Sequence, residues 1–153
     1  MVLALIAALD ATHLTPKYQV GSVYYYNHPT YGVQKYRYIQ NTSGASIGAN
    51  LGAMQENGTS VWNGILSGAA CAQPRFLGLR QTGALADTYY GWVLADGYGL
   101  ATSNGTTGAN APQKALANGR FDDGAVGSDE LFVHACEAQN VAGSTFLCRV
   151  MAA

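Results

Sequence analysis

The side chains best suited to hold a metal ion are three histidines and three cysteines, but their spacing does not gather four ligands. His134 and Cys136 come closest to a pair of metal ligands, because residues two apart on a predicted strand lie on the same face. Zinc takes four ligands, so two more would be needed. Asp122, Asp123 and Asp129 carry the oxygen ligands that calcium prefers, but they lack the EF-hand spacing. We therefore expect neither a metal nor a cofactor.

Two acidic pairs, Asp122–Asp123 and Asp129–Glu130, are the candidates for acid–base chemistry. Neighbouring side chains on a strand point to opposite faces, so adjacent carboxylates cooperate poorly as general acid and base. Glycines near both pairs are typical of turns. The sequence contains no nucleophile elbow, phosphate-binding loop or dinucleotide-binding motif. We predict that the chain is not an enzyme, and keep a small hydrolase using His134 with Asp122 or Asp123 as an alternative.

Tyrosine is the most abundant aromatic residue, with 10 among 153 positions. A platform of exposed rings could stack bases or sugars. Base stacking normally accompanies a basic groove, and only Lys35 and Arg37 lie near the cluster. With 8 Lys and Arg against 9 Asp and Glu, no nucleic-acid partner is expected. We favour a tyrosine-rich sheet whose hydroxyls reach water at its rim. The cluster comprises Tyr24, Tyr25, Tyr26, Tyr36 and Tyr38.

The longest apolar run is Met1–Leu9, which ends at Asp10. It is too short for a bilayer, which needs about 20 residues, and no basic residue precedes it as in a secretory signal. It is either a first strand or short helix buried in the fold, or an arm that docks on a neighbouring chain. We predict an N-terminal apolar arm over residues 1–16 and a single β domain over 17–153. The expected partner-contact residues of the arm are Met1, Val2, Leu3, Leu5, Ile6 and Leu9.

The elements that position these residues are predicted to be short strands. Charged residues make up only 11% of the chain and glycine is frequent at 19, which together with tyrosine favours a turn-rich β protein. No long stretch has the helical period. We predict an all-β fold, a small barrel or sandwich of short antiparallel strands. The expected strands are 20–26, 36–40, 51–55, 61–66, 75–80, 88–95, 131–137 and 145–150.

The connections are predicted from glycine, asparagine and proline. Asn57–Gly58 and Asp96–Gly97 are typical turn dipeptides. Segment 103–112 has almost nothing apolar to bury and is expected to be an exposed loop. Residues 111–118 could form at most a short helical turn. The last two strands are expected to pair as a C-terminal hairpin.

Alternation along the strands predicts which side chains share a face. Tyr36 and Tyr38 lie on one face of their strand, and Ile39 lies on the other. Trp92 shares a face with Leu94 in the next long strand. Segment 131–137 is apolar on both faces, as expected for a buried strand.

Short motifs follow one another in a recognisable order along the chain. They are Gly21–Tyr24, Lys35–Asn41, Phe76–Leu79, Tyr90–Val93, Gly119–Asp123 and Leu131–His134. This order resembles the decoration or cement proteins that coat the heads of tailed bacteriophages. In that family a Tyr-Arg-Tyr strand follows a glycine-containing strand, a Tyr-Gly-Trp strand lies at mid-chain, and an Asp-Asp turn precedes the end. The resemblance covers the chain from about Gly21 onward.

The resemblance implies a virion structural protein on the outer capsid surface. It would be made in the host bacterial cytoplasm and would bind the major capsid protein of the assembled head as a homo-trimer. Binding only to the assembled form would stabilise the shell by mass action. The alternative is a tail- or fibre-associated β protein that binds a host glycan, suggested by the tyrosine cluster and by segment 103–112. Neither interpretation involves a membrane or a nucleic acid.

Overall fold

The computed structural model describes residues 9–56, 61–66, 75–124 and 133–152. Its regular elements are almost entirely β-strands, which confirms the predicted all-β class. Among these residues, no helix has the length and apolar character needed to cross a membrane. The elements are β1 (Val23–His28), β2 (Gly32–Asn41), β3 (Gly52–Gln55), β4 (Asn63–Leu66), β5 (Phe76–Leu79), β6 (Tyr90–Thr102), β7 (Pro112–Ala115), the 3₁₀ turn η2 (Ala117–Gly119), β8 (Phe121–Asp123), β9 (Val133–Ala135) and β10 (Thr145–Met151).

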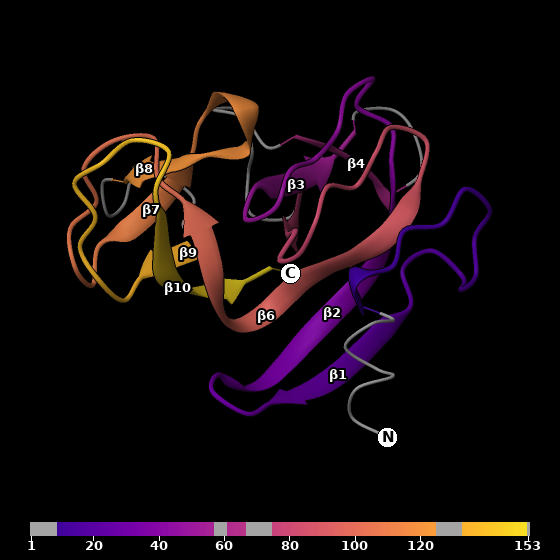
Figure 1. Cartoon of the computed structure of the whole chain (residues 1–153), viewed down its shortest axis with the longest axis horizontal. Helices are drawn as coiled ribbons and strands as arrows, with labels where there is room; N and C mark the ends of the chain where they lie inside the picture. The colour runs from indigo at the N-terminus through magenta and orange to yellow at the C-terminus, as the bar shows by residue number, and fades with distance from the viewer. Residues whose placement is uncertain (1–8, 57–60, 67–74, 125–132, 153) are drawn as a thin grey trace.

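The strands form one sheet that closes on itself at one end and stays open at the other (Figure 1). β2, β4, β3, β5 and β6 pair in that order, and β6 pairs again with β2, which closes a ring. β1 adds to β2 as an edge strand, while β10, β9, β7 and β8 continue the sheet beyond β6. The pairings are antiparallel except between β2 and β4, where Gln40–Asn41 runs parallel to Asn63–Gly64. This parallel pair corrects the expectation of antiparallel strands throughout.

β6 is the strand that joins the ring to the open sheet. It pairs with β2 as far as Lys35 opposite Asp96, and with β10 from Asp96 to the end of the strand. The turn predicted at Asp96–Gly97 is therefore wrong, because the strand bends and changes partner there without reversing. Gly97 has a φ of 114°, and a Cβ on it would lie 2.9 Å from the Val33 carbonyl oxygen. The dipeptide marks a bend in a continuous strand. A bend with a positive φ favours glycine for the same reason that a turn does.

Replacing Gly97 by alanine is expected to lower the free energy of unfolding by about 1–3 kcal/mol, because the side chain is strained at this φ and meets the neighbouring backbone. Urea unfolding followed by circular dichroism measures the change. Gly105→Ala is the control, since a Cβ there would have no neighbour closer than 3.9 Å. Equal effects of the two substitutions would contradict the assigned role of Gly97.

Two hydrophobic cores lie on opposite faces of the ring strands. Inside the ring, a Cβ on Gly64 of β4 would lie 2.7 Å from Ile39 Cδ1 of β2 and 3.5 Å from Leu77 Cδ1 of β5, so β5 approaches the paired strands β2 and β4 there. Val93 of β6 belongs to the same core. The larger core lies outside the ring and extends to β8, β9 and β10. Its members are Leu9, Tyr26, Tyr36, Tyr38, Met54, Phe76, Leu79, Trp92, Leu94, Ala101, Ala115, Phe121, Val133, Ala135, Phe146, Cys148 and Val150.

The predicted alternation of faces is confirmed on both long strands. Tyr36 and Tyr38 lie in the outer core, while Ile39 lies inside the ring. Trp92 and Leu94 likewise share the outer core. This alternation places the aromatic side chains of β2 and β6 together on the side where the candidate site described below is found.

In the C-terminal region the structure confirms one prediction, the hairpin, and contradicts two others. β9 pairs antiparallel with β10, with Ala135 opposite Cys148, as predicted. Residues 111–118 do not form a helical turn as a unit, because Pro112–Ala115 is strand β7. Segment 103–112 is not wholly exposed either, since Ser103 and Thr107 are fully buried. Their backbones make isolated bridges to Phe121 and Gln139, which pin the loop to the sheet. The predicted Asn57–Gly58 turn lies outside the described residues.

Candidate functional site

The histidine and cysteine proposed as a possible ligand pair lie at the end of β9. His134 is half-buried, opposite Arg149 of β10, which agrees with its interpretation as a strand residue. Cys136 is also half-buried, and burial raises the pKa of its thiol. Across the described residues, no group of three or more His, Cys, Asp or Glu side chains is placed to hold a metal ion.

The acidic residues of β8 have a structural role in the described fold. Asp123 accepts hydrogen bonds from Gln113 Nε2 at 2.8 Å and from the Gly108 backbone N–H at 3.1 Å. Asp122 accepts one from the Asp123 backbone N–H at 2.9 Å. These contacts hold the loop before β7 against β8. The second pair, at 129–130, lies outside the described residues.

The tyrosine cluster does not form an exposed platform. Tyr26, Tyr36 and Tyr38 are buried, at 5%, 7% and 0% exposure, so their faces cannot stack an external ligand. Their hydroxyls do not lie at a wet rim either: Tyr38 Oη, for example, lies 3.0 Å from Nδ1 of His13. Within the cluster only Tyr25 is strongly exposed. The rings of β2 therefore belong mainly to the core.

The described part of the N-terminal segment packs against the β domain. Leu9 is 7% exposed and belongs to the outer core. His13 exchanges two backbone hydrogen bonds with Tyr90, the first residue of β6. Of the residues predicted to contact a partner, Leu9 is thus buried within this chain. Met1, Val2, Leu3, Leu5 and Ile6 lie outside the described residues.

A buried arginine holds this segment in place. Arg80 is 1% exposed, and its Nη1 donates hydrogen bonds to the carbonyls of Leu9 at 3.2 Å and Trp92 at 3.0 Å. Its Nη2 donates to the Asp10 carbonyl at 2.9 Å, and its Nε donates to the Gly83 carbonyl at 3.4 Å. Burial lowers the pKa of the guanidinium, and the negative charge of Asp10 opposes that shift. Sequence reasoning placed Arg80 at a strand end without recognising this anchoring role.

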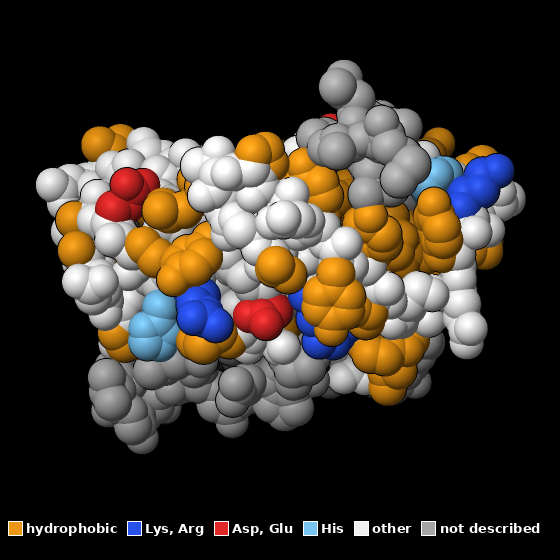
Figure 2. Space-filling view, turned by 90° about the horizontal axis from the view of Figure 1, so that it is seen from below, with side chains coloured by type: hydrophobic (Ala, Val, Ile, Leu, Met, Phe, Trp, Pro, Cys, Tyr) orange, Lys and Arg blue, Asp and Glu red, His pale blue; other side chains and the backbone are white. Residues whose placement is uncertain are grey.

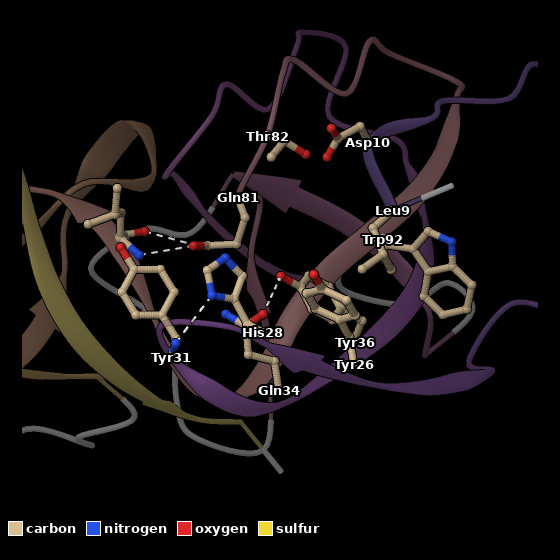
Figure 3. A pocket seen from close by; sticks show the side chains of 11 residues that line it. Leu9, Asp10, Tyr26, His28, Tyr31, Gln34, Tyr36, Gln81, Thr82 and Trp92 are labelled. Carbon is tan, nitrogen blue, oxygen red and sulfur yellow. Dashed lines mark hydrogen bonds between the residues drawn. The ribbon is translucent and has the colours of Figure 1, made fainter. Parts of the chain in front are cut away.

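Leu9 and Asp10, whose carbonyls bind Arg80, also line a small pocket with a volume of about 190 Å³ (Figure 3). Leu9 and Asp10 border it on the N-terminal side, and Gln81 and Thr82 border it just after β5. The remaining lining comes from β1, β2, β6 and the turn between the first two. These residues are Tyr26, His28, Tyr31, Gln34, Tyr36, Trp92 and Leu100.

Hydrogen bonds hold several of the polar side chains of the pocket in fixed positions. Tyr36 donates from its hydroxyl to Gln34 Oε1 at 3.2 Å, and Gln34 Nε2 donates to the Tyr98 carbonyl. Gln81 accepts from the Leu100 backbone N–H at 2.9 Å and donates to the carbonyl of the same residue at 3.0 Å. Burial, and then the charge of Asp10, raise the pKa of Tyr36, so its hydroxyl stays protonated.

Two other groups of the pocket keep free hydrogen-bonding capacity. The Tyr26 hydroxyl is buried and has no hydrogen-bond partner among the described residues. His28 Nδ1 accepts from the backbone N–H groups of Thr30 and Tyr31, so the neutral ring carries its proton on Nε2. That ring stacks on Tyr31 with 4.5 Å between centroids, which fixes its orientation. The pocket thus combines apolar walls with polar groups that can bind a further molecule.

A second surface, the outer face, runs across the exposed side of β1, β2, β6 and β10. Tyr25 lies beside Lys35, and Lys35 lies beside Asp96. Tyr98 lies beside Arg149, whose guanidinium is 5.8 Å from the Tyr98 ring centroid. β1 and β2 lie lowest in Figure 1, and the view from below shows hydrophobic side chains among single charged ones (Figure 2). The exposed apolar residues of the outer face are Val23, Tyr25, Val33 and Tyr98.

The fold defines an all-β protein in which a closed ring of strands continues into an open sheet. No protein-family model matches the chain, and no curated protein matches it. Among solved structures, the chain is similar to the N base of the head fiber gp8.5 of bacteriophage phi29. The TM-score is 0.53 with 8% sequence identity, and the match covers 75% of this chain and 93% of that one. At this identity the similarity shows a shared fold.

Proposed function

We propose that this chain is a structural protein of a phage virion that acts by binding to the head. The observation that supports this most is the fold it shares with the head fiber base, since the match covers 93% of that structure. The order of sequence motifs that resembles capsid decoration proteins points to the same class independently. We propose a binding role without catalysis, in keeping with a sequence that lacks the common catalytic motifs.

Within this class, the first candidate is a decoration or cement protein on the outer capsid surface. Its partner would be the major capsid protein, and it would bind as a homo-trimer. The second candidate is the base of a fibre that attaches to the head, which is favoured by the description of the similar structure as a head fiber base. Both candidates require a surface that binds an assembled shell.

The outer face is the surface that we propose for this contact. It presents Tyr25 and Tyr98 at 63% and 41% exposure, together with Lys35, Asp96 and Arg149. Aromatic residues and arginine are enriched in protein interfaces, and single charges of both signs limit non-specific association. Because most of the buried area would be apolar, binding should depend only weakly on salt.

The experiment mixes the purified chain with phage heads that lack it and sediments the heads. We expect the chain to co-sediment and to raise the temperature at which the heads open, because a ligand of the assembled form stabilises it. Tyr98→Glu should abolish co-sedimentation and leave the monomer folded, since the side chain is exposed. Glu137→Gln, at another exposed position, is the matched control. Failure of the unaltered chain to bind heads would contradict the proposal.

A variant lacking residues 1–8 tests the apolar arm separately. We expect it to fold with little loss of stability, because the cut leaves Leu9 in the core and the contacts of Arg80 intact. If residues 1–8 dock on a partner, its binding to heads should weaken, since burial of apolar surface contributes about 25 cal/mol per Å². Thermal unfolding and co-sedimentation measure the two effects. A variant that unfolds would instead assign the segment to the core of the monomer.

A further inference from the structure

The small pocket has a donor and acceptor set that restricts the chemistry of what it can bind. The Tyr26 side chain is 5% exposed and its hydroxyl has no partner among the described residues. A buried hydroxyl without a hydrogen bond is costly, so a bound group that pairs with it gains that free energy. Nε2–H of His28 adds a donor, and the exposed Asp10 adds a charged acceptor at the rim. These groups surround the space drawn in Figure 3.

The charges around the pocket disfavour ionic ligands. The Asp10 carboxylate repels an anion at the rim. The buried Arg80 guanidinium, which donates hydrogen bonds to the carbonyls of the pocket residues Leu9 and Asp10, disfavours a cation. A wholly apolar ligand would bury the Tyr26 hydroxyl and the His28 N–H without partners. The remaining class is a neutral molecule that both donates and accepts hydrogen bonds.

Size and wall chemistry narrow that class further. A volume of about 190 Å³ lies below the range of about 300–1,000 Å³ usual for ligand pockets, which favours a ligand no larger than a single ring. The lining includes the apolar residues Leu9 and Trp92, which would pack on an apolar ligand face. A pyranose ring has such a C–H face and a rim of hydroxyls that both donate and accept.

We propose that this pocket binds one neutral sugar residue, with hydroxyls of the sugar paired to Tyr26, His28 and Asp10. The inference goes beyond the proposed structural role, because sugar and shell would be bound by different surfaces. The outer face carries Tyr25 on the side of β1 opposite to Tyr26, so loss of one interaction leaves the other intact. A particle-bound chain could thereby present a sugar-binding site to its surroundings.

The experiment is saturation-transfer-difference NMR on the purified full chain. The probes are the methyl glycosides of glucose, mannose, galactose and N-acetylglucosamine, each tested separately. We expect at least one to receive saturation, with a dissociation constant in the millimolar range as suits so small a ligand. Inorganic phosphate and methylammonium are the charged probes and should not displace it. The proposal would be overturned if none of the glycosides received saturation, or if phosphate or methylammonium displaced a bound glycoside.

Tyr26→Phe is the decisive variant, because it removes one oxygen that has no hydrogen-bond partner in the described part of the chain. We expect binding of the sugar to weaken by about 3- to 10-fold, the effect of one neutral hydrogen bond. Thermal stability should stay equal or rise, since a buried unpaired hydroxyl is lost. Tyr25→Phe, at the neighbouring exposed position, is the matched control and should change neither quantity. A loss of stability in Tyr26→Phe would make the hydroxyl a structural group and contradict its role in binding.

Asp10→Asn provides a second and independent variant at the exposed rim. Its backbone carbonyl still accepts from Arg80, so the fold should be retained, with a small loss of stability because the charge that favours the buried guanidinium is removed. Sugar binding should weaken by about 10-fold or more, because hydrogen bonds to a charged acceptor are stronger than neutral ones. Unchanged binding in both Tyr26→Phe and Asp10→Asn would place the sugar elsewhere and refute the site. Co-sedimentation with phage heads should be normal in both variants, which separates this result from a failure of the proposed function.

Discussion

Arg80→Met is expected to lower the free energy of unfolding by about 3–5 kcal/mol. Methionine fills a similar volume without donors, so the carbonyls of Leu9, Asp10 and Trp92 would lose their hydrogen bonds in a buried region. Each such carbonyl left without a partner costs about 1–3 kcal/mol. Removing a buried charged group from its partners has a similar total effect. Urea unfolding at neutral pH gives the change in free energy directly.

A second measurement distinguishes this anchor from a general packing effect. Limited proteolysis should cut Arg80→Met near Leu9 faster than it cuts the unaltered chain, because the start of the described chain loses its attachment. Arg120→Met is the control, since Arg120 is exposed, and should shift stability by no more than about 0.5 kcal/mol. If Arg80→Met also changed the free energy of unfolding by no more than about 0.5 kcal/mol, the hydrogen bonds of Arg80 would contribute little to the stability of the native state.

Trp92→Ala is expected to destabilise the protein by about 3–5 kcal/mol, the usual cost of truncating a buried large aromatic residue. Trp92 is 5% exposed, and its ring centroid lies 5.0 Å from that of Tyr38 and 5.2 Å from that of Tyr18. The substitution removes these contacts and leaves a cavity in the outer core beside the pocket. Thermal and urea unfolding measure the effect.

The control for Trp92 lies on the same strand. Tyr98→Ala removes a ring that is 41% exposed, and should cost far less. The proposed sugar pocket would also lose part of its wall in Trp92→Ala, so this variant tests stability and is unsuitable as a binding test. A shift below about 1 kcal/mol for Trp92→Ala would contradict its central position.

The strands were largely predictable because β-forming residues and turn residues alternate clearly along the chain. Period-two alternation correctly assigned Tyr38 and Ile39 to opposite faces. The ring closure was not predictable, because β6 pairs both with its sequence neighbour β5 and with β2, which lies far from β6 in sequence. Asp96–Gly97 was misassigned because a turn and a strand bend place the same demand on glycine.

The pocket could not be predicted, because it combines single residues from several elements. His28, Gln81 and Trp92 are distant in sequence and carry no shared motif. The sequence pointed instead to tyrosines, and the fold buries most of that cluster while leaving the Tyr26 hydroxyl without a partner among the residues that the structure describes. Alanine at Tyr36 or Tyr38 would damage the core, whereas phenylalanine at position 26 removes only the oxygen.

The continuous course of β6 through both regions has a mechanical consequence. A pull applied to the β7–β10 region passes along the covalent backbone of β6 into the ring, and no loop interrupts the strand between the two regions. Hydrogen bonds along β6 then share the load as a set, and resist shearing more strongly than they would if broken one at a time. If the chain were attached at one end to a shell under internal pressure, it would transmit tension to the attachment point before its strands unfolded.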